Sequence, residues 1–256
     1  AEHTPTGLIP LDLGDVLGLD YLATTPTLLT RYAKICADEA LSVSFKAAGT
    51  VYYVIRGEGC STQDNNVIEW RAGDLFCFPG AGKTVHQAGA RDSLLFLATN
   101  EPLLSIDRLS PPPPAEAVVE TVHWPADEIT RQFEPVLRRP ITEKTSGHAV
   151  LFSSSALGGS TNILPTVNCA LNTLESGKDQ RPHRHNGVAV TLCIRGQGVY
   201  SQIDDQRVDW IDFGVQITPP AALHSHHNRG PERMECLIFQ DEALHYYTRT
   251  PGFSWT

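Results

Sequence analysis

The chain has 256 residues, of which 41% are hydrophobic and 19% are charged, a composition typical of a globular protein with enough apolar side chains for a core. The formal net charge is -9 and no basic run is longer than Arg138-Arg139, which argues against a nucleic-acid surface and against attraction to anionic membranes. The chain has no run of about 18 apolar residues that would predict a transmembrane helix, and its first residues lack a charged-then-apolar signal pattern.

The first 40 residues are expected to form an N-terminal arm, residues 1–40, with one short helix. Thr25 is a good N-cap and Pro26 suits the first helical position. The helix would continue through a set of spaced apolar residues, Leu28, Leu29, Tyr32 and Ile35.

After the arm, short β-rich runs alternate with turns that contain glycine and proline. This pattern predicts an all-β barrel over residues 41–109 and a second one over residues 148–256. The four prolines after Ser110 predict an extended linker over residues 110–147, with a short helix from Asp127 to Leu137 that Pro135 disturbs.

The two β-rich regions repeat one another. Residues 54–59 end in Arg-Gly-Glu-Gly and match residues 193–198, which end in Arg-Gly-Gln-Gly. Residues 73–79 resemble residues 213–219, and Trp70 falls in register with Trp210. A repeat of this length is a whole domain, so we expect two similar barrels.

Histidines cluster in the second repeat only. His183 and His185 are two residues apart, so on a strand they point to the same face. His224 follows the Pro219-Pro220 turn on another strand and can complete a metal site from across the barrel. Three neutral imidazoles suit Fe(II), Zn, Mn, Ni or Cu and leave coordination positions open.

These spacings resemble the two motifs of the cupins, small jelly-roll β-barrels that hold a metal ion. The segment Gly177-x5-His183-x-His185 through Gly196 looks like the first motif, and Pro219 through His224 to Asn228 looks like the second. The resemblance implies a two-cupin protein with His183, His185 and His224 as the metal ligands.

The chain departs from the usual cupin pattern in two places. The glutamate that normally follows the second histidine is Ala189, which implies three histidine ligands and no carboxylate. In the first repeat, counting back from the Arg-Gly turn puts Ser44 and Lys46 at the first two ligand positions. Thr84 falls at the third, with His86 at the place of His226. The first barrel is therefore expected to bind no metal.

A two-cupin chain with three histidines and no glutamate resembles gentisate 1,2-dioxygenase and its relatives that act on salicylates. The resemblance implies an Fe(II)-dependent dioxygenase for a small hydroxylated aromatic acid, using O2, with His226 beside the metal in an acid–base role. Candidate substrate contacts are polar residues near the ligand strands: Asn168, Asn172, Gln180, Arg181 and Gln202. Arg195 is a weaker candidate, since Arg56 occupies the same place in the first repeat.

Two other functions stay open at this stage. The same three histidines could hold Zn, Mn or Ni in an isomerase, lyase or hydrolase, and the barrel could be a non-catalytic small-molecule binder. Exposed barrel edges favour a homo-oligomer. The six scattered cysteines favour reduced thiols over a disulfide framework and so a cytoplasmic location.

Overall fold

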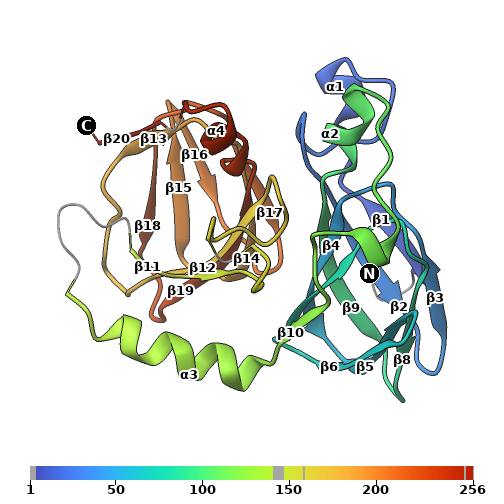
Figure 1. The fold of residues 1–256 in the computed structure, drawn as a ribbon. Helices are drawn as coiled ribbons and strands as arrows, with labels where there is room; N and C mark the ends of the chain where they lie inside the picture. The colour runs from blue at the N-terminus through green and yellow to red at the C-terminus, as the bar shows by residue number, and fades with distance from the viewer. Residues whose placement is uncertain (1–3, 141–146, 158, 251, 256) are drawn as a thin grey trace. The chain divides into compact units, whose positions relative to one another are not determined.

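The computed structural model of the chain describes residues 4–140, 147–157, 159–250 and 252–255. The chain divides into two compact units, Ala1–Thr130 with Ser154–Gly159, and Arg131–Ser153 with Ser160–Thr256. Each unit contains a barrel of antiparallel strands (Figure 1), which confirms the all-β, two-barrel prediction. No helix in the described ranges is long and apolar enough to cross a membrane.

The first barrel is made of a six-stranded and a four-stranded sheet. The larger sheet has the order β1 (Gly7–Pro10), β2 (Leu29–Ile35), β9 (Ser93–Thr99), β4 (Gly49–Arg56), β7 (Leu75–Pro79), β10 (Val122–Trp124). The smaller sheet has the order β3 (Ala40–Val43), β8 (Thr84–Ala88), β5 (Glu58–Gln63), β6 (Asn66–Arg71).

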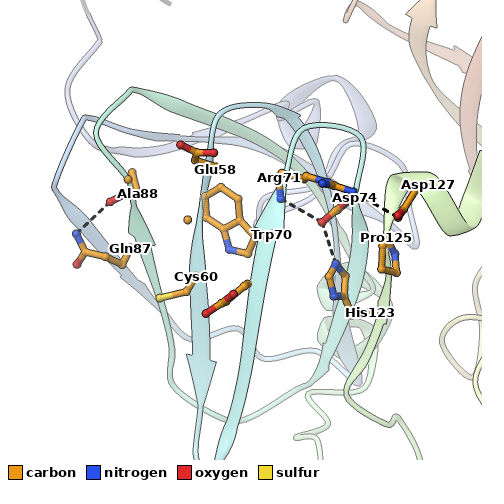
Figure 2. A pocket seen from close by; sticks show the side chains of 13 residues that line it. Glu58, Cys60, Trp70, Arg71, Asp74, Gln87, Ala88, His123, Pro125 and Asp127 are labelled. Carbon is orange, nitrogen blue, oxygen red and sulfur yellow. Dashed lines mark hydrogen bonds and ion pairs between the residues drawn. The ribbon is translucent and has the colours of Figure 1, made fainter.

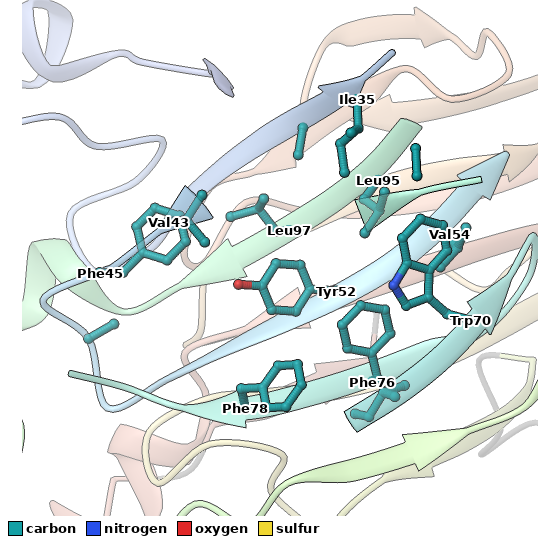
Figure 3. Close-up of a cluster of buried hydrophobic side chains, with 14 residues drawn as sticks. Ile35, Val43, Phe45, Tyr52, Val54, Trp70, Phe76, Phe78, Leu95 and Leu97 are labelled. Atoms are coloured by element: carbon teal, nitrogen blue, oxygen red, sulfur yellow. The ribbon is translucent and has the colours of Figure 1, made fainter. Parts of the chain in front are cut away.

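The interior of the first barrel is filled by large apolar side chains from both sheets (Figure 3). Tyr52 on β4 stacks on Phe76 on β7, with ring centroids 4.9 Å apart, and meets Phe78 edge-on at 6.5 Å. All three rings are almost completely buried. Burial of aromatic rings of this size dominates the apolar contribution to core stability.

The second barrel is made of two five-stranded sheets. One has the order β11 (His148–Phe152), β12 (Asn168–Leu174), β19 (Met234–Gln240), β14 (Ala189–Arg195), β17 (Val215–Thr218). The other has the order β16 (Gln206–Asp209), β15 (Val199–Ile203), β18 (His224–Asn228), β13 (His183–His185), β20 (Phe253–Trp255).

The two barrels repeat one another strand by strand, as the sequence repeat predicts. The order β2-β9-β4-β7 in the first corresponds to β12-β19-β14-β17 in the second, and β3-β8-β5-β6 corresponds to β13-β18-β15-β16. Even an irregularity is shared. The β4–β9 ladder shifts register between Val54 and Arg56, and the β14–β19 ladder shifts between Cys193 and Arg195.

The predicted helix in the N-terminal arm is wrong. Residues Leu29–Ile35 form strand β2, which pairs with β1 on one side and β9 on the other. The Thr25 hydroxyl accepts a hydrogen bond from the Leu28 N–H across a tight turn, not at a helix start. Pairing on both edges of a strand overrides local helix propensity.

The helices are short and lie outside the barrel sheets. They are α1 (Gly14–Leu17), α2 (Glu101–Ile106), a 3-10 turn (Pro114–Glu116), α3 (Ala126–Leu137) and α4 (Ala243–Tyr247). The helix predicted from Asp127 to Leu137 is confirmed as α3, which accommodates Pro135 in its last turn.

Part of the proline-containing segment joins the first barrel. Strand β10 pairs with β7, and its His123 Nε2 lies 2.9 Å from the buried Asp74 carboxylate (Figure 2). The same carboxylate accepts hydrogen bonds from the Ala126 N–H at 2.8 Å and the Arg71 N–H at 3.1 Å. Asp74 thereby connects β10 and the start of α3 to the barrel.

His86 generates a prediction on acid stability. Burial lowers the pKa of His86 from 6.5 to about 3. Between these values the unfolded chain binds a proton that the folded chain does not. The contribution of neutral His86 to the free energy of unfolding is therefore complete above pH 6.5. It declines as the pH falls toward 3, by at most about 1.4 kcal/mol per pH unit.

The measurement is urea unfolding between pH 7 and pH 4 for the wild type and for His86→Leu. We expect the variant to show a shallower loss of unfolding free energy with acid, whatever its stability at pH 7. Equal slopes for the two proteins would show that His86 does not titrate as described.

Candidate metal centre

Three histidines converge at the pairing of two strands in the second barrel. His183 on β13 lies directly opposite His224 on β18, and His185 points to the same face because it is two residues along the strand. One nitrogen from each ring lies within 4.8 Å of the others, and all three residues are buried. The structure thus brings together the three residues predicted as metal ligands.

A backbone hydrogen bond sets which ring nitrogen each histidine presents. The Nδ1 atom of His183 lies 3.0 Å from the Arg181 carbonyl, that of His185 lies 2.7 Å from the Gly187 carbonyl, and that of His224 lies 3.0 Å from the Ala222 carbonyl. A carbonyl oxygen only accepts, so each Nδ1 carries the proton. The Nε2 lone pairs are left for a metal ion, the arrangement seen in protein metal sites.

Burial favours the neutral form of two of these rings, those of His183 and His224. It lowers the pKa of His183 from its ordinary value and lowers that of His224 to about 4. In both cases the backbone hydrogen bond opposes the shift but does not cancel it. Because a metal binds the neutral imidazole, the site is ready for a divalent cation at neutral pH.

The histidines line a small cavity of about 100 Å³ inside the barrel. Asn172 on β12 faces it, and its buried Oδ1 atom has no hydrogen-bond partner. Buried polar atoms are normally paired, so this acceptor indicates a missing ligand or water. The three imidazoles and this acceptor fit a divalent metal ion with a small polar ligand.

No such histidine group is found among the described residues of the first barrel, and the positions predicted there need a correction. Val43 pairs with Thr84 as His183 pairs with His224, so Val43 and Phe45 occupy the places of His183 and His185. Counting back from the turn gave Ser44 and Lys46, which point outward and are exposed. The count was off by one because the loops before the two turns differ in length. The residues at the three positions, Val43, Phe45 and Thr84, are not usual metal ligands.

His226 belongs to a hydrogen-bonded set that both barrels share. Its Nδ1 lies 2.8 Å from Ser201 Oγ, which also accepts a bond from Trp210 Nε1 at 2.8 Å. In the first barrel His86 contacts Ser61 at 2.6 Å, and Trp70 donates to that serine at 2.7 Å. The repetition in a barrel without metal ligands favours a structural origin for this set.

The second barrel adds one bond that decides the protonation of His226. Gln216 Nε2 also donates to Ser201 Oγ, at 2.8 Å. With two donors bound, the serine hydroxyl must give its own proton to His226 Nδ1. Burial lowers the pKa of His226 to about 3, so the ring is neutral with its proton on Nε2. His226 lines the cavity and can donate a hydrogen bond there, but it does not become charged near pH 7.

The predicted substrate residues divide into two groups. Asn172 and Gln180 line the cavity, and Asn168 lies on the same face of β12 as Asn172. The prediction for Gln202 is not supported, because its side chain is on the outer face of β15 and donates to the Asp204 carbonyl at 2.8 Å. Arg181 is exposed and lies over the Trp255 ring at 5.4 Å, outside the lining.

Arg195 has the structural role that the repeat suggested. Its guanidinium lies 3.7 Å from Glu232 and 3.8 Å from Glu235, at the barrel surface.

Six residues that line the cavity were missed in the sequence, and three of them, Thr191, Thr218 and Ile238, lie on the barrel strands. Gln240 at the end of β19 and Glu242 just beyond it both line the cavity, and Phe253 on β20 stacks on His183 with ring centroids 5.0 Å apart. Strand alternation could have placed Gln240 on the inner face. Nothing local to Phe253 indicates that β20 pairs with the ligand strand β13.

A larger groove of about 680 Å³ lies on the first barrel, between β5, β6 and β10 (Figure 2). Its His123 and Asp74 bind one another. The converging set of metal-binding side chains in the described residues is the triad of the second barrel, so the smaller cavity is the better candidate for chemistry.

Comparison with known proteins shows which sequences and which folds the chain resembles. No protein-family profile matches it. A segment of 81 residues is 32% identical to 5-aminosalicylate 1,2-dioxygenase from a Comamonas species, which is 32% of this chain and 22% of that enzyme's length. The match therefore spans well under two thirds of the relative.

Two solved structures show the extent of the similarity in fold. Salicylate 1,2-dioxygenase from Pseudaminobacter salicylatoxidans aligns with a TM-score of 0.81 at 13% identity, over 98% of this chain and 80% of that one. An oxalate decarboxylase mutant from Bacillus subtilis aligns with a TM-score of 0.59 at 16% identity, over 91% and 72%. The chain has the two-cupin fold.

The first site prediction concerns metal content. The double variant His183→Ala/His185→Ala should lose the divalent metal that the wild type retains when purified without chelator, because two of three ligands are gone. Elemental analysis of the purified proteins measures this. His227→Ala is the matched control, since His227 on the same strand β18 binds Asp179 at 2.6 Å and stacks on Tyr200. Metal retained by the double variant would place the site elsewhere.

Proposed function

We propose that this two-cupin chain binds one Fe(II) ion through His183, His185 and His224 and cleaves the ring of a small hydroxylated aromatic acid with O2. The observation that carries the proposal is the ligand set itself: three neutral imidazoles with no carboxylate, in a fold shared with salicylate 1,2-dioxygenase. The 5-aminosalicylate 1,2-dioxygenase segment adds a second protein of the same reaction class.

The missing carboxylate matters for the charge of the site. Ala189 faces the cavity where the cupin pattern has glutamate, so the three ligands themselves carry no negative charge, and the carboxylate that does line the cavity, that of Glu242, lies outside the triad. An anionic ligand with two oxygens would balance the charge of the ion. No arginine or lysine stands among the described residues that line the cavity, so the cation for a carboxylate would be the ion itself.

Iron would supply one capability here, bringing O2 and the substrate together at adjacent positions. The protein's own residues would orient the substrate. His226 Nε2–H donates toward the cavity, and Asn172 Oδ1 accepts from a hydroxyl group. The cavity is smaller than the 300–1,000 Å³ or so of typical ligand pockets, which suits a small molecule.

These contacts change the role proposed for His226. A ring that stays neutral near pH 7 is a poor proton shuttle, since an acid–base group works best with a pKa near the working pH. We propose that His226 positions an oxygen atom of the bound ligand through its Nε2–H, and that Ser201, Trp210 and Gln216 fix the ring for that purpose.

Location and assembly are also proposals. The six cysteines are all free, including Cys193 and Cys236, which lie opposite one another in the β14–β19 pair. Free thiols in such a pairing support the cytoplasm, a reducing compartment. Edge strands such as β16 support a homo-oligomer formed by sheet addition.

The activity prediction uses oxygen dependence. The iron-loaded protein should consume O2 with salicylate, gentisate or 5-aminosalicylate and open the ring, while the His183→Ala/His185→Ala variant should not. The measurement is O2 uptake together with the absorbance change of the ring, in air and under nitrogen. Turnover that continues under nitrogen, or that needs zinc or manganese in place of iron, would favour an isomerase, lyase or hydrolase.

A further inference from the structure

Gln240 reaches the metal side of the histidine triad. It is the last residue of β19 and lines the cavity. Its side-chain nitrogen lies 3.3 Å from His185 Nε2, the nitrogen that is left for a metal because Nδ1 is bonded to the Gly187 carbonyl. The end of the glutamine amide therefore lies beside the coordinating atom of a predicted ligand.

This separation is the one expected between two ligands of one ion. Ligand atoms about 2.1 Å from a metal and in neighbouring positions lie about 3.0 to 3.4 Å apart in octahedral or tetrahedral geometry. The 3.3 Å between Gln240 and His185 falls within this range. The two side-chain ends are therefore close enough to contact one ion.

The strand register puts Gln240 next to the position of the missing glutamate. Gln240 on β19 pairs directly with Ala189 on β14. Alanine at that position leaves space in the cavity for a longer side chain from the neighbouring strand. The amide can thus come from β19 to the region that a glutamate at 189 would have occupied.

The orientation of the amide has a structural solution. An amide binds a hard or borderline cation through its oxygen, so Oε1 must face the triad and Nε2 must find an acceptor elsewhere. Asn168 on β12 pairs directly with Gln240, and its buried Oδ1 atom has no hydrogen-bond partner. Directly opposed side chains on paired strands lie within reach of one another. A half-turn of the Gln240 amide about its Cγ–Cδ bond would direct Oε1 toward the triad and Nε2 toward Asn168 Oδ1.

The first barrel provides an internal comparison. In that barrel Thr99 stands at the position of Gln240. Its two strand partners are Leu29, at the position of Asn168, and Thr50, at the position of Ala189. The barrel without metal ligands has neither amide. The two amides and the three histidines occur together in the same barrel.

We propose that Gln240 supplies its amide oxygen as a fourth protein ligand to the metal, with Asn168 as the residue that positions the amide. This rests on the metal site proposed above. Such a ligand would occupy, before substrate binds, one of the positions that three histidines leave open, without adding negative charge. It would have to leave that position when a two-oxygen substrate and O2 are bound together, because an octahedral ion has six positions.

The test measures metal binding rather than turnover. Metal-free wild type, Gln240→Ala, Gln240→Glu and Asn168→Ala are titrated with Co(II), with affinity from calorimetry and coordination from the visible absorption of the ion. Gln202→Glu is the matched control, because it adds the same charge on the outer face of the same barrel. Thermal unfolding of the metal-free proteins checks that each variant is folded.

We expect Gln240→Ala to weaken Co(II) binding about tenfold or more and to alter the absorption bands, with a smaller effect from Asn168→Ala. Gln240→Glu should bind Co(II) more tightly than wild type and change the bands, while Gln202→Glu should match wild type. A wild-type affinity and spectrum in folded Gln240→Ala would overturn the role of Gln240 and leave the histidine site standing. A wild type that binds no Co(II) would overturn both.

Discussion

The interior of a small barrel has to be filled by side chains, and the two barrels of this chain differ in the side chains that fill it. In the first barrel Tyr52, Phe76 and Phe78 pack against one another and close the interior. The strand pairings place Thr191, Gln216 and Thr218 at the same three positions of the second barrel. Two of them, Thr191 and Thr218, are smaller than the aromatic residues they correspond to and line the cavity into which the histidines point. The difference between a structural barrel and a candidate enzyme barrel is thus mainly a difference in core volume.

The cavity has a cost in packing, because lost core volume weakens a barrel. Short-range hydrogen bonds compensate by holding the polar side chains in place. Each triad histidine is bonded to a carbonyl two residues away, and His226 is held by Ser201 within a set that the first barrel also contains. The site therefore reuses a framework present in both halves and adds to it the three imidazoles, Gln216 and the amides of Gln240 and Asn168.

The errors of sequence interpretation occur where strand pairing or strand register decides the conformation or the face of a residue. Leu29–Ile35 has a plausible helix start at Thr25, yet it lies between two strands and is extended. Ser44 and Lys46 were misplaced by one residue, and on a strand a slip of one exchanges the inner and outer faces. Gln202 was chosen for its polarity, although its neighbour Ser201 is the residue that points inward.

Repeats and alternate spacing are local properties, so the amino-acid sequence alone predicts the two barrels, the second of them as the candidate metal site, and its three histidines. The surroundings of the triad become visible in the three-dimensional structure. Gln240 lies beside His185 and Phe253 covers His183, although more than 50 residues separate each pair along the chain. Those contacts arise from antiparallel pairing of β19 with β14 and of β20 with β13, and no local pattern encodes the partner of a strand.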